Sequence, residues 1–501
     1  MKKNPNYQKG FFVTMVLIFS FVFLILLGGL FIFILYQHRY SLQTVAREDA
    51  FHIAEAGLNY YRWYLNHYPN DVQAGQDWCC DSPPCEVCGP YEFNFYDTNN
   101  SLVGHFSLQI KPKKICDEVL GIQIIATAWT EQFPEIRRTL KVKYASTSVA
   151  EYAYLIDEAV WAGEDRAVYG KYHSNNGVRM DATHNSIVTS ATEEWACTLS
   201  FGCSPFSCPS PCRVENWICY CPGVFGDGGP QDLWNYPIPP FDFNGITADL
   251  AKIKDLAQSK GKYFPPSTDL RADGKGYHLT LNPDGTFDLK IITSLGRVWA
   301  YDYDHGWHWD YHVIQSEADL PSPYGPQDNV ALPSGCGLIF VEDDLWIEGT
   351  VSGRITVASA NLVDPFTDTG IVLNGNIDYT TLDGSDSLAV ITQEDILIPL
   401  YSPEDMVVAG VYVSQKGRSV SRNYYSCWRY PWDCKKDTLT IYGSVISRKR
   451  VGTKWVNFWG IFTSGYETRY DYFDQKLALD PPPLLPYVSE DMQFISWEEV
   501  E

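Results

Sequence analysis

Basic residues are scarce in this sequence, and their scarcity excludes a general nucleic-acid-binding surface. The 501 residues include 38 lysines and arginines against 61 aspartates and glutamates, for a formal net charge of −23. Binding to a phosphate backbone needs the opposite balance, because clustered positive charge supplies most of that affinity. The one basic cluster, residues 448–450 with Lys454, is expected to be a solvated turn at a strand end. We therefore expect no nucleic-acid partner.

Known catalytic motifs are also missing from the sequence. It contains no G-x-S-x-G nucleophile elbow, no H-E-x-x-H zinc motif, no phosphate-binding loop and no dinucleotide-binding fingerprint. The carboxylates of 342–344, Asp383 and Asp386 are candidates to line a groove, but chance pairs are common among 61 acidic residues. We predict neither an enzyme activity nor a cofactor.

Methionine is rare, with 5 residues, whereas aromatic residues make up 15% of the chain. There are 33 tyrosines, 25 phenylalanines and 16 tryptophans. Flat rings pack well on pleated surfaces, so this composition favours β-structure. The hydrophobic content of 45% excludes a wholly disordered chain. A length of 501 residues indicates two to four structural units.

Charge is absent from Phe11 to Tyr36, a run of 26 residues. As a helix this run is about 39 Å long, against a hydrocarbon core of about 30 Å, so we predict a transmembrane helix over 11–36. Residues 1–10 form a basic leader with three lysines. Because positive charge stays in the cytoplasm, we expect a single-pass protein with a cytoplasmic N-terminus. The body then lies outside the cytoplasmic membrane, in the periplasm or at the cell surface.

The apolar run passes directly into an amphipathic helix, expected over 37–68. Apolar and small residues recur in it at steps of three and four, which is the spacing of one helix face. Short β-rich runs follow in 69–147, separated by turn residues and accompanied by a Cys-rich loop. We expect these runs to form an antiparallel sheet that covers the apolar stripe of the helix.

The remaining sequence is expected to be a mainly β body. Residues 148–335 read as a β-rich domain with a Cys- and Pro-rich insertion at 195–243 and a short helix at 246–260, capped by Asn244. Residues 336–501 read as a β-helix-like domain with a Pro-rich tail. The fold class is therefore α+β, and the brief Val- and Ile-rich runs favour a parallel β-helix for the body. A β-sandwich is the alternative.

Two stretches of the helix carry a resemblance to a known family. Lys9-Gly10-Phe11 ends the basic leader, and Phe51-His-Ile-Ala-Glu-Ala-Gly-Leu58 follows in the amphipathic part. This arrangement resembles the type IV pilins and the type 4 fimbrial biogenesis protein PilX N-terminal family. The matching motif residues are Ala54, Glu55, Ala56, Gly57 and Leu58, while Phe51 departs from the family's alanine.

The resemblance implies a role in filament assembly. A leader peptidase is expected to cut between Gly10 and Phe11, and other pilin-like subunits, the assembly machinery and the membrane are the expected partners. The family usually has an acidic residue five places into the mature helix, where this chain has Met15. Some minor pilins also lack this carboxylate, which places the chain with minor or tip subunits rather than with the main shaft.

The cysteines fall into local groups, which predicts disulfides in an oxidising compartment. The twelve candidates are Cys79, Cys80, Cys85, Cys88, Cys197, Cys203, Cys208, Cys212, Cys219, Cys221, Cys427 and Cys434. We expect Cys427 to pair with Cys434 and the 197–221 group to pair within itself. Cys116 and Cys336 stand alone. Cys85-Glu-Val-Cys88 also resembles half of a zinc site, which is the alternative for the first group.

The densest cluster of polar and aromatic residues lies at Tyr301–His312, where a turn at 304–306 predicts a hairpin. Alternation puts rings on one face and carboxylates and imidazoles on the other. We expect the rings to pack against the body; a divalent metal or a stacked sugar are the alternatives. The candidate ligand residues are Asp302, Asp304, His308, Asp310, His312, Trp307 and Trp309.

The sequence is therefore consistent with two functions. The first is a membrane-anchored minor-pilin-like or pseudopilin-like protein with a structural or adhesive role at a filament tip. The second is a tethered, exported β-helix protein that binds or cleaves polysaccharide, so that a carbohydrate or cell-surface ligand is possible.

Overall fold

The structure, a computed structural model, describes residues 8–68, 71–76, 79, 86–116, 118–245, 249–333, 335–364, 366–457 and 460–500. The chain divides into two compact units. The first unit comprises Met1–Lys113, Gly121–Tyr144 and Phe494–Glu501, and the second comprises Lys114–Leu120 and Ala145–Gln493. The chain contains a long N-terminal apolar helix and a mainly β body, as predicted.

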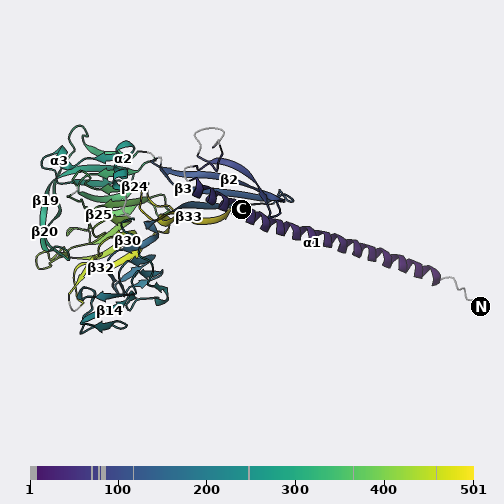
Figure 1. The fold of residues 1–501 in the computed structure, drawn as a ribbon, viewed down its shortest axis with the longest axis horizontal. Coiled ribbons are helices and arrows are strands. Elements are labelled where there is room, and N and C mark those ends of the chain that lie inside the picture. The colour runs from purple at the N-terminus through teal and green to yellow at the C-terminus, as the bar shows by residue number, and fades with distance from the viewer. Residues whose placement is uncertain are drawn as a thin grey trace, which may run out of the picture. The chain divides into compact units, whose positions relative to one another are not determined.

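Helix α1 runs without interruption from Gln8 to His67, as the amphipathic continuation of the apolar run predicted (Figure 1). Large apolar side chains from Phe11 to Tyr36 are exposed, and this stretch is long and apolar enough to cross a membrane. The second half of the helix is different, because one stripe of it is buried. The buried stripe contains Ala46, Ala50, Ile53, Ala54, Leu58, Tyr61 and Leu65.

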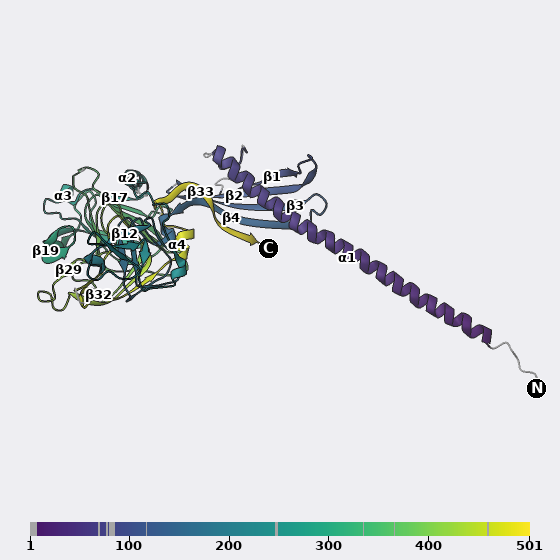
Figure 2. The same ribbon diagram turned by 60° about the horizontal axis from the view of Figure 1, so that its bottom comes forward.

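A five-stranded sheet buries this stripe in the first unit (Figure 2). Its strands, in spatial order, are β1 (Cys88–Tyr96), β2 (Leu102–Ile115), β3 (Glu118–Thr130), β4 (Arg137–Ser148) and β33 (Tyr487–Val500). The pairs β1–β2 and β3–β4 are antiparallel, as expected. The sequence assigned the residues of β33 to the Pro-rich tail of the last domain, but they form the fifth strand of this sheet instead.

The second unit is dominated by parallel ladders of short strands. One ladder contains, in spatial order, β17 (Lys262–Phe264), β22 (Leu338–Val341), β24 (Arg354–Ser359), β26 (Ser387–Thr392), β28 (Asp405–Ser414), β30 (Lys435–Ser447), β5 (Tyr152–Ile156), β8 (Lys171–Ser174), β11 (Val188–Ser190) and β16 (Trp234–Asn235). This ladder unites strands from 148–335 and 336–501, which the sequence treats as separate. The link is the pairing of Val445 in β30 with Tyr154 in β5.

A second set of strands stacks in parallel in the same way. It contains β18 (Tyr277–Leu281), β23 (Leu345–Val351), β25 (Ile371–Tyr379), β32 (Phe462–Tyr472), β7 (Arg166–Val168) and β10 (Thr183–His184), with β28 and β30 between β25 and β32. Three further short strands pair in parallel: β6 (Val160–Ala162), β9 (Val178–Met180) and β15 (Val224–Phe225).

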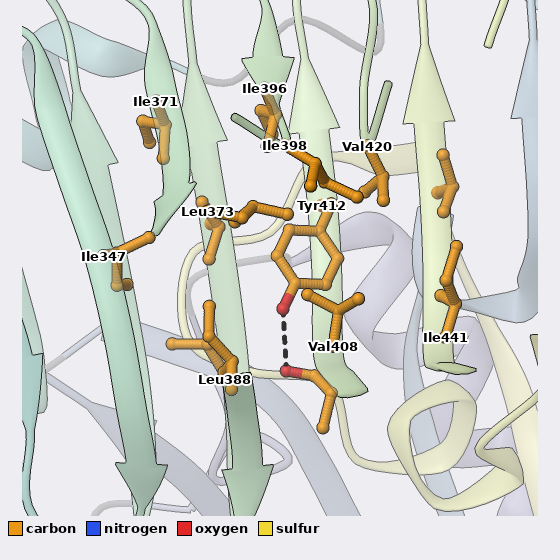
Figure 3. Packing of buried hydrophobic residues seen from close by; sticks show 14 of the residues in the cluster. Ile347, Ile371, Leu373, Leu388, Ile396, Ile398, Val408, Tyr412, Val420 and Ile441 are labelled. Atoms are coloured by element: carbon orange, nitrogen blue, oxygen red, sulfur yellow. Dashed lines mark hydrogen bonds between the residues drawn. The ribbon is translucent and has the colours of Figure 1, made fainter. Parts of the chain in front are cut away.

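Inward side chains of these strands form the core of the second unit (Figure 3). Leu373, Leu388, Val408 and Ile441 gather around Tyr412 and are at most 2% exposed. The Tyr412 hydroxyl donates to the carbonyl of Ala409 at 3.0 Å, which satisfies its only polar atom. Burial of one such aliphatic side chain contributes about 1.5–3 kcal/mol, so the stacked strands supply most of the driving force.

The short helix of the second unit begins later than the sequence predicted. Helix α2 spans Leu250–Ser259, and its N-cap is Asp249, whose side chain accepts from the Lys252 amide at 2.9 Å. The expected cap, Asn244, instead receives a hydrogen bond from Arg448 at 3.1 Å. Residue 246, the expected start of the helix, lies outside the described residues.

Two glycines stack where the β28 and β30 strands cross the core, and we expect Gly443→Ala to lower the free energy of unfolding by about 1–3 kcal/mol. Gly443 has φ +139°, and a Cβ there would lie 2.0 Å from the carbonyl oxygen of Gly410, its ladder partner. Urea unfolding of the full chain in detergent measures the change. Gly452→Ala is the control, because a Cβ there meets no atom within 4 Å. Equal stability of the two variants would contradict the prediction.

Candidate functional site

The A-E-A-G-L motif lies in the buried half of α1 and holds the helix against its sheet. Ala54 and Leu58 are fully buried, and a Cβ on Gly57 would lie 2.7 Å from the ring of Phe106 in β2. Glu55 is half-buried and lies 3.1 Å from the ring of His52 on the same helix. The small residues therefore permit a close helix–sheet contact. Within the described ranges of the chain, the motif residues form no catalytic or ligand-binding arrangement.

The second candidate site is the hairpin of β19 (Thr286–Asp302) and β20 (Gly306–Ala318). Its two faces lie opposite to the expected orientation. Asp302 and Asp310 are 1% and 3% exposed, whereas Trp307 and Trp309 are 49% and 36% exposed. The carboxylates and imidazoles therefore point toward the body of the second unit, and the rings point away from it. The expectation that the rings pack on the body holds only in part: Tyr303 stacks on Trp455 and Trp307 meets Tyr424, but one side of the rings stays exposed.

Polar partners from the body explain this orientation. The Asp310 carboxylate accepts from the Asn423 amide at 3.1 Å and from the Tyr425 hydroxyl at 2.9 Å, and it pairs with His312. Burial alone would raise the pKa of Asp310, but the His312 charge and these donors lower it. A buried carboxylate is tolerated when it is paired and hydrogen-bonded in this way.

Asp302 is held by the turn of its own hairpin. Its carboxylate accepts from the backbone amides of Asp304 and His305, both at 2.7 Å. Burial opposes the charged form of Asp302, but the hydrogen bond from His305 and the charge of Arg418 lower its pKa. The Arg418 guanidinium lies 3.7 Å from this carboxylate. The hairpin is thus fixed to the body by its charged face.

A cavity of about 640 Å³, lined by both charged and apolar residues, lies between the hairpin and the ladders. Its charged and aromatic lining residues are Asp302, His305, His308, Trp309, Asp310, Tyr311, His312, Asp344, Trp346, Glu394, Asp395, Arg418 and Lys449. A second hollow of about 470 Å³ shares Arg418 and Lys449 with it and continues past Tyr303 and Arg450. The two hollows together form a groove with both acidic and basic walls.

Stacking of successive strands brings distant residues together in this cavity. The amide of Leu345 donates to Gly370, that of Ile371 to Asp395, and that of Ile396 to Arg418, at 2.7–3.1 Å. Asp344, Gly370, Asp395 and Arg418 therefore follow one another along the stack at about 4.8 Å per strand. The sequence signal was a step of 26, 25 and 23 residues between these positions.

Ion pairs occupy part of the cavity wall. Arg418 donates to the Asp395 carboxylate at 2.5 and 3.0 Å, and the Lys449 ammonium lies 2.9 Å from Asp304. Asp344 remains accessible from the cavity, but the surrounding protein desolvates it and raises its pKa to about 6. Desolvation also raises the pKa of Glu394. Among the acidic side chains that line the cavity, Asp344 and Glu394 are the ones that form no ion pair with another described side chain.

The other predicted acidic and basic positions have structural partners. Glu342 is buried and accepts from Lys254 and Tyr263, each at 2.6 Å. Asp383 and Asp386 accept hydrogen bonds within the 380–386 loop. Arg448 and Lys454 pair with Asp157 and Asp165, each at 3.0 Å. The basic cluster is therefore neutralised by acidic neighbours rather than left as a solvated turn.

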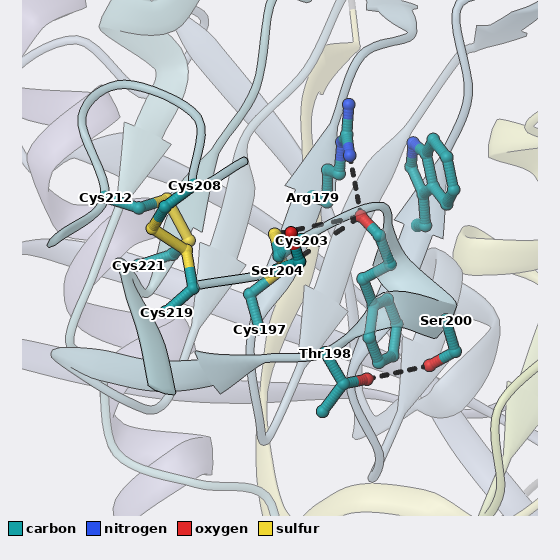
Figure 4. The surroundings of a disulfide bond; sticks show 12 residues. Arg179, Cys197, Thr198, Ser200, Cys203, Ser204, Cys208, Cys212, Cys219 and Cys221 are labelled. Carbon is teal, nitrogen blue, oxygen red and sulfur yellow. Dashed lines mark hydrogen bonds between the residues drawn. A yellow bond between two sulfur atoms is a disulfide. The ribbon is translucent and has the colours of Figure 1, made fainter. Parts of the chain in front are cut away.

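The hairpin residues do not converge on a metal position. In the part of the chain that the structure describes, groups of three close ligand atoms occur only among the cysteines of 197–221. Those cysteines are joined as Cys197–Cys203, Cys208–Cys219 and Cys212–Cys221 (Figure 4). The hairpin thus gives no support to the metal alternative.

The remaining disulfides follow the expected local pairing with one exception. Cys427 is joined to Cys434, and Cys79 to Cys88, which removes Cys88 as half of a zinc site. Cys80 and Cys85 lie outside the described residues. Cys116 and Cys336, which the sequence left unpaired, form a bridge across 220 residues. The fold brings the two cysteines together, and the neighbouring backbone is joined as well: the Cys116 amide donates to the carbonyl of Gly335 at 3.0 Å.

Known proteins were compared with this chain by sequence and by structure. No family model matches the sequence, and no curated protein matches it. Among solved structures, the chain is similar to the crystal structure of the competence-associated pilin ComZ from Thermus thermophilus, at 13% sequence identity and a TM-score of 0.28. That similarity covers 91% of this chain and 97% of the other.

Proposed function

We propose that the protein is a membrane-anchored, pilin-like subunit that takes part in the assembly of a type IV pilus or a related filament. The observation that carries the proposal is the unbroken helix α1, Gln8–His67. Its first half has exposed apolar side chains, and one stripe of its second half is buried under a five-stranded sheet. Such a helix anchors the chain in the membrane before assembly and packs among neighbouring helices after it.

The likeness of the A-E-A-G-L motif to the PilX N-terminal family supports a minor rather than a main subunit. Met15 stands where the family usually has a carboxylate. A subunit that lacks this charge cannot neutralise the terminal amine of its neighbour inside an apolar bundle, where an unpaired charge is costly. A subunit at the filament tip has a neighbour on one side only, so it has fewer terminal amines to neutralise. We therefore propose a tip or initiating role, structural or adhesive.

The second unit is best interpreted as the exported body of this subunit. We propose that its stacked strands form a parallel β-helix, because consecutive strands pair in parallel along at least two ladders and enclose one core. A formal net charge of −26 in residues 37–501, which contain all 61 acidic and 35 of the 38 basic residues, keeps such a body soluble outside the membrane. Its cysteine pairs fit an oxidising compartment.

Processing of the leader tests the proposal. In cells that express a prepilin peptidase, we expect the mature chain to begin at Phe11, as measured by mass spectrometry of the membrane-extracted protein. Gly10→Val is expected to leave the leader uncut and to remove the protein from sheared filaments. Gly29→Val is the matched control, since a Cβ at Gly29 meets no atom within 4 Å. An intact N-terminus in the presence of the peptidase would contradict the proposal.

A second candidate function is a tethered polysaccharide-binding or polysaccharide-cleaving body, and the two carboxylates that face the cavity favour it. Asp344, with its pKa raised to about 6, and Glu394 face a space of about 640 Å³. In this alternative, α1 serves only as an anchor. Exchange of 11–36 for an unrelated transmembrane helix separates the two, because a tether tolerates the exchange and a filament subunit does not.

A further inference from the structure

We propose that the outward face of the β19–β20 hairpin binds a neutral polysaccharide whose sugar rings carry equatorial hydroxyls, as in β-1,4-linked glucose. We call this face the aromatic platform. It consists of Trp299, Tyr301, Tyr303, Trp307 and Trp309 of the hairpin with Tyr424 and Trp455 beside it. The inference deepens the adhesive role and rests on the proposed location outside the membrane.

The rings of the platform form one connected surface. Trp299 and Trp307 stack with centroids 6.1 Å apart and planes 8° from parallel. Tyr303 stacks on Trp455 at 5.0 Å, and Trp307 meets Tyr424 edge to face at 5.7 Å. The surface therefore joins the hairpin to β29 (Tyr424–Tyr425) and β31 (Lys454–Val456), two elements more than 100 residues away in sequence.

Exposure of these rings is costly and calls for an explanation. Tyr303 is 56% exposed and Trp307 is 49% exposed. Clustered aromatic residues on a surface are typical of binding sites, because soluble proteins otherwise bury them. The inward charged face of the hairpin forces the exposure, since Asp302 and Asp310 are fixed to the body. The exposure of the platform rings is therefore a consequence of how the hairpin is fixed to the body.

The rings are held in place before any ligand arrives. Trp299 lies opposite Trp309, and Tyr301 opposite Trp307, in the β19–β20 register. The backbone amide of Trp299 also donates to the Tyr430 hydroxyl at 2.6 Å, which attaches β19 to the Cys427–Cys434 loop. A preorganised surface loses little conformational entropy on binding, so even shallow contacts contribute to affinity.

The chemistry of the platform fits a sugar better than a protein or a lipid surface. A pyranose with equatorial hydroxyls has flat apolar C–H faces that stack on aromatic rings and a polar rim around them. With the residues that the structure describes, no hydrogen bond is made by the phenol oxygens of Tyr301, Tyr303 and Tyr424 or the indole nitrogens of Trp307 and Trp309. These groups are available to hydroxyls at the rim.

Charge favours a neutral polymer over an anionic one. The nearest cations already lie over platform rings: Arg297 and Arg429 over Trp309, at 4.7 and 5.1 Å, and Arg450 over Tyr303 at 5.3 Å. The exported part of the chain is strongly acidic, so an anionic polysaccharide is repelled at long range. Binding to a neutral chain is expected to change little with salt.

Co-sedimentation of the purified full chain, in detergent micelles, with insoluble cellulose tests the inference. We expect the chain to sediment with cellulose at low and high salt. Trp307→Ala is expected to weaken the binding about threefold to tenfold, and Trp307→Ala with Tyr303→Ala further. Trp217→Ala is the matched control, because Trp217 is 73% exposed but lies in the loop between β13 (Arg213–Glu215) and β14 (Ile218–Pro222).

Several results would overturn the inference. They are equal binding by Trp307→Ala and Trp217→Ala, absence of binding to cellulose, or salt-sensitive binding to polygalacturonate alone. Preferential sedimentation with phosphatidylcholine vesicles would assign the platform to a lipid surface instead. Thermal unfolding of each variant confirms that the fold is kept. The assay needs no filament, so its failure and a failure of leader processing are distinguishable.

Discussion

Replacement of Asp471 by asparagine is expected to lower the free energy of unfolding of the second unit by about 3–5 kcal/mol. Asp471 lies in β32 and pairs with the Arg166 guanidinium of β7; its side chain is 3% exposed and that of Arg166 is 5% exposed. The Tyr154 hydroxyl of β5 donates to the same carboxylate at 2.7 Å. Asparagine keeps the shape but leaves the buried arginine without its counter-charge. Urea unfolding of the full chain in detergent measures the change.

An exposed ion pair provides the control for this prediction. Lys416 lies 2.5 Å from Asp368, but the lysine side chain is 53% exposed, so Asp368→Asn is expected to cost at most about 1 kcal/mol. The double replacement Arg166→Met with Asp471→Leu removes both charges and is expected to recover part of the loss. Equal effects of Asp471→Asn and Asp368→Asn would show that the buried pair does not stabilise the stack.

The three partners of this buried network illustrate what the sequence conceals. Tyr154 and Arg166 lie near the start of the second unit and Asp471 near its end, and the ladder brings them together because β30 pairs with β5 and β32 pairs with β7. No local pattern specifies that late strands stack on early ones. The steps between stacked positions also vary, as at residues 344, 370, 395 and 418. An unequal period hides the stack from periodicity arguments.

Helix α1 is the opposite case, because its signals are local. An uncharged run longer than the membrane, followed by apolar residues at steps of three and four, specifies the helix and its buried stripe without distant information. Gly57 contributes in the same way, since a small residue within the stripe predicts a close approach to another element. The partner of Gly57, Phe106, became evident only from the structure.

The orientation of the β19–β20 hairpin depended on distant residues as well. Its alternation of rings and charges was evident from the sequence, but the side that faces the body was not. Asn423 and Tyr425 determine which face of the hairpin is turned to the body, because they donate to Asp310 from 113 and 115 residues away in sequence. Hydrophobicity alone predicts the wrong face, because two satisfied carboxylates and an ion pair outweigh the exposure of the rings. The aromatic platform exists only because of that balance.

Removal of the Cys116–Cys336 bridge is expected to destabilise the second unit more than removal of any short-range bridge. The bridge closes a loop of 220 residues, whereas Cys427–Cys434 closes one of 7. In the chain-entropy account, a longer loop restricts the unfolded chain more, and the two lengths differ by about 3 kcal/mol. We therefore expect Cys116→Ser with Cys336→Ser to lose about 3 kcal/mol more than Cys427→Ser with Cys434→Ser.

Urea unfolding of the two double variants under non-reducing conditions measures this difference, and a thiol assay that compares the denatured wild type with the Cys116→Ser, Cys336→Ser variant measures the bridge itself. The bridge is buried, with Cys116 and Cys336 each 3% exposed, and Lys260 donates to the Cys116 carbonyl at 3.1 Å. Because each pair is replaced completely, no free thiol complicates the comparison. If the wild type yields two more free thiols than the Cys116→Ser, Cys336→Ser variant, or if the Cys427 variant is the less stable, the long bridge does not hold the second unit together.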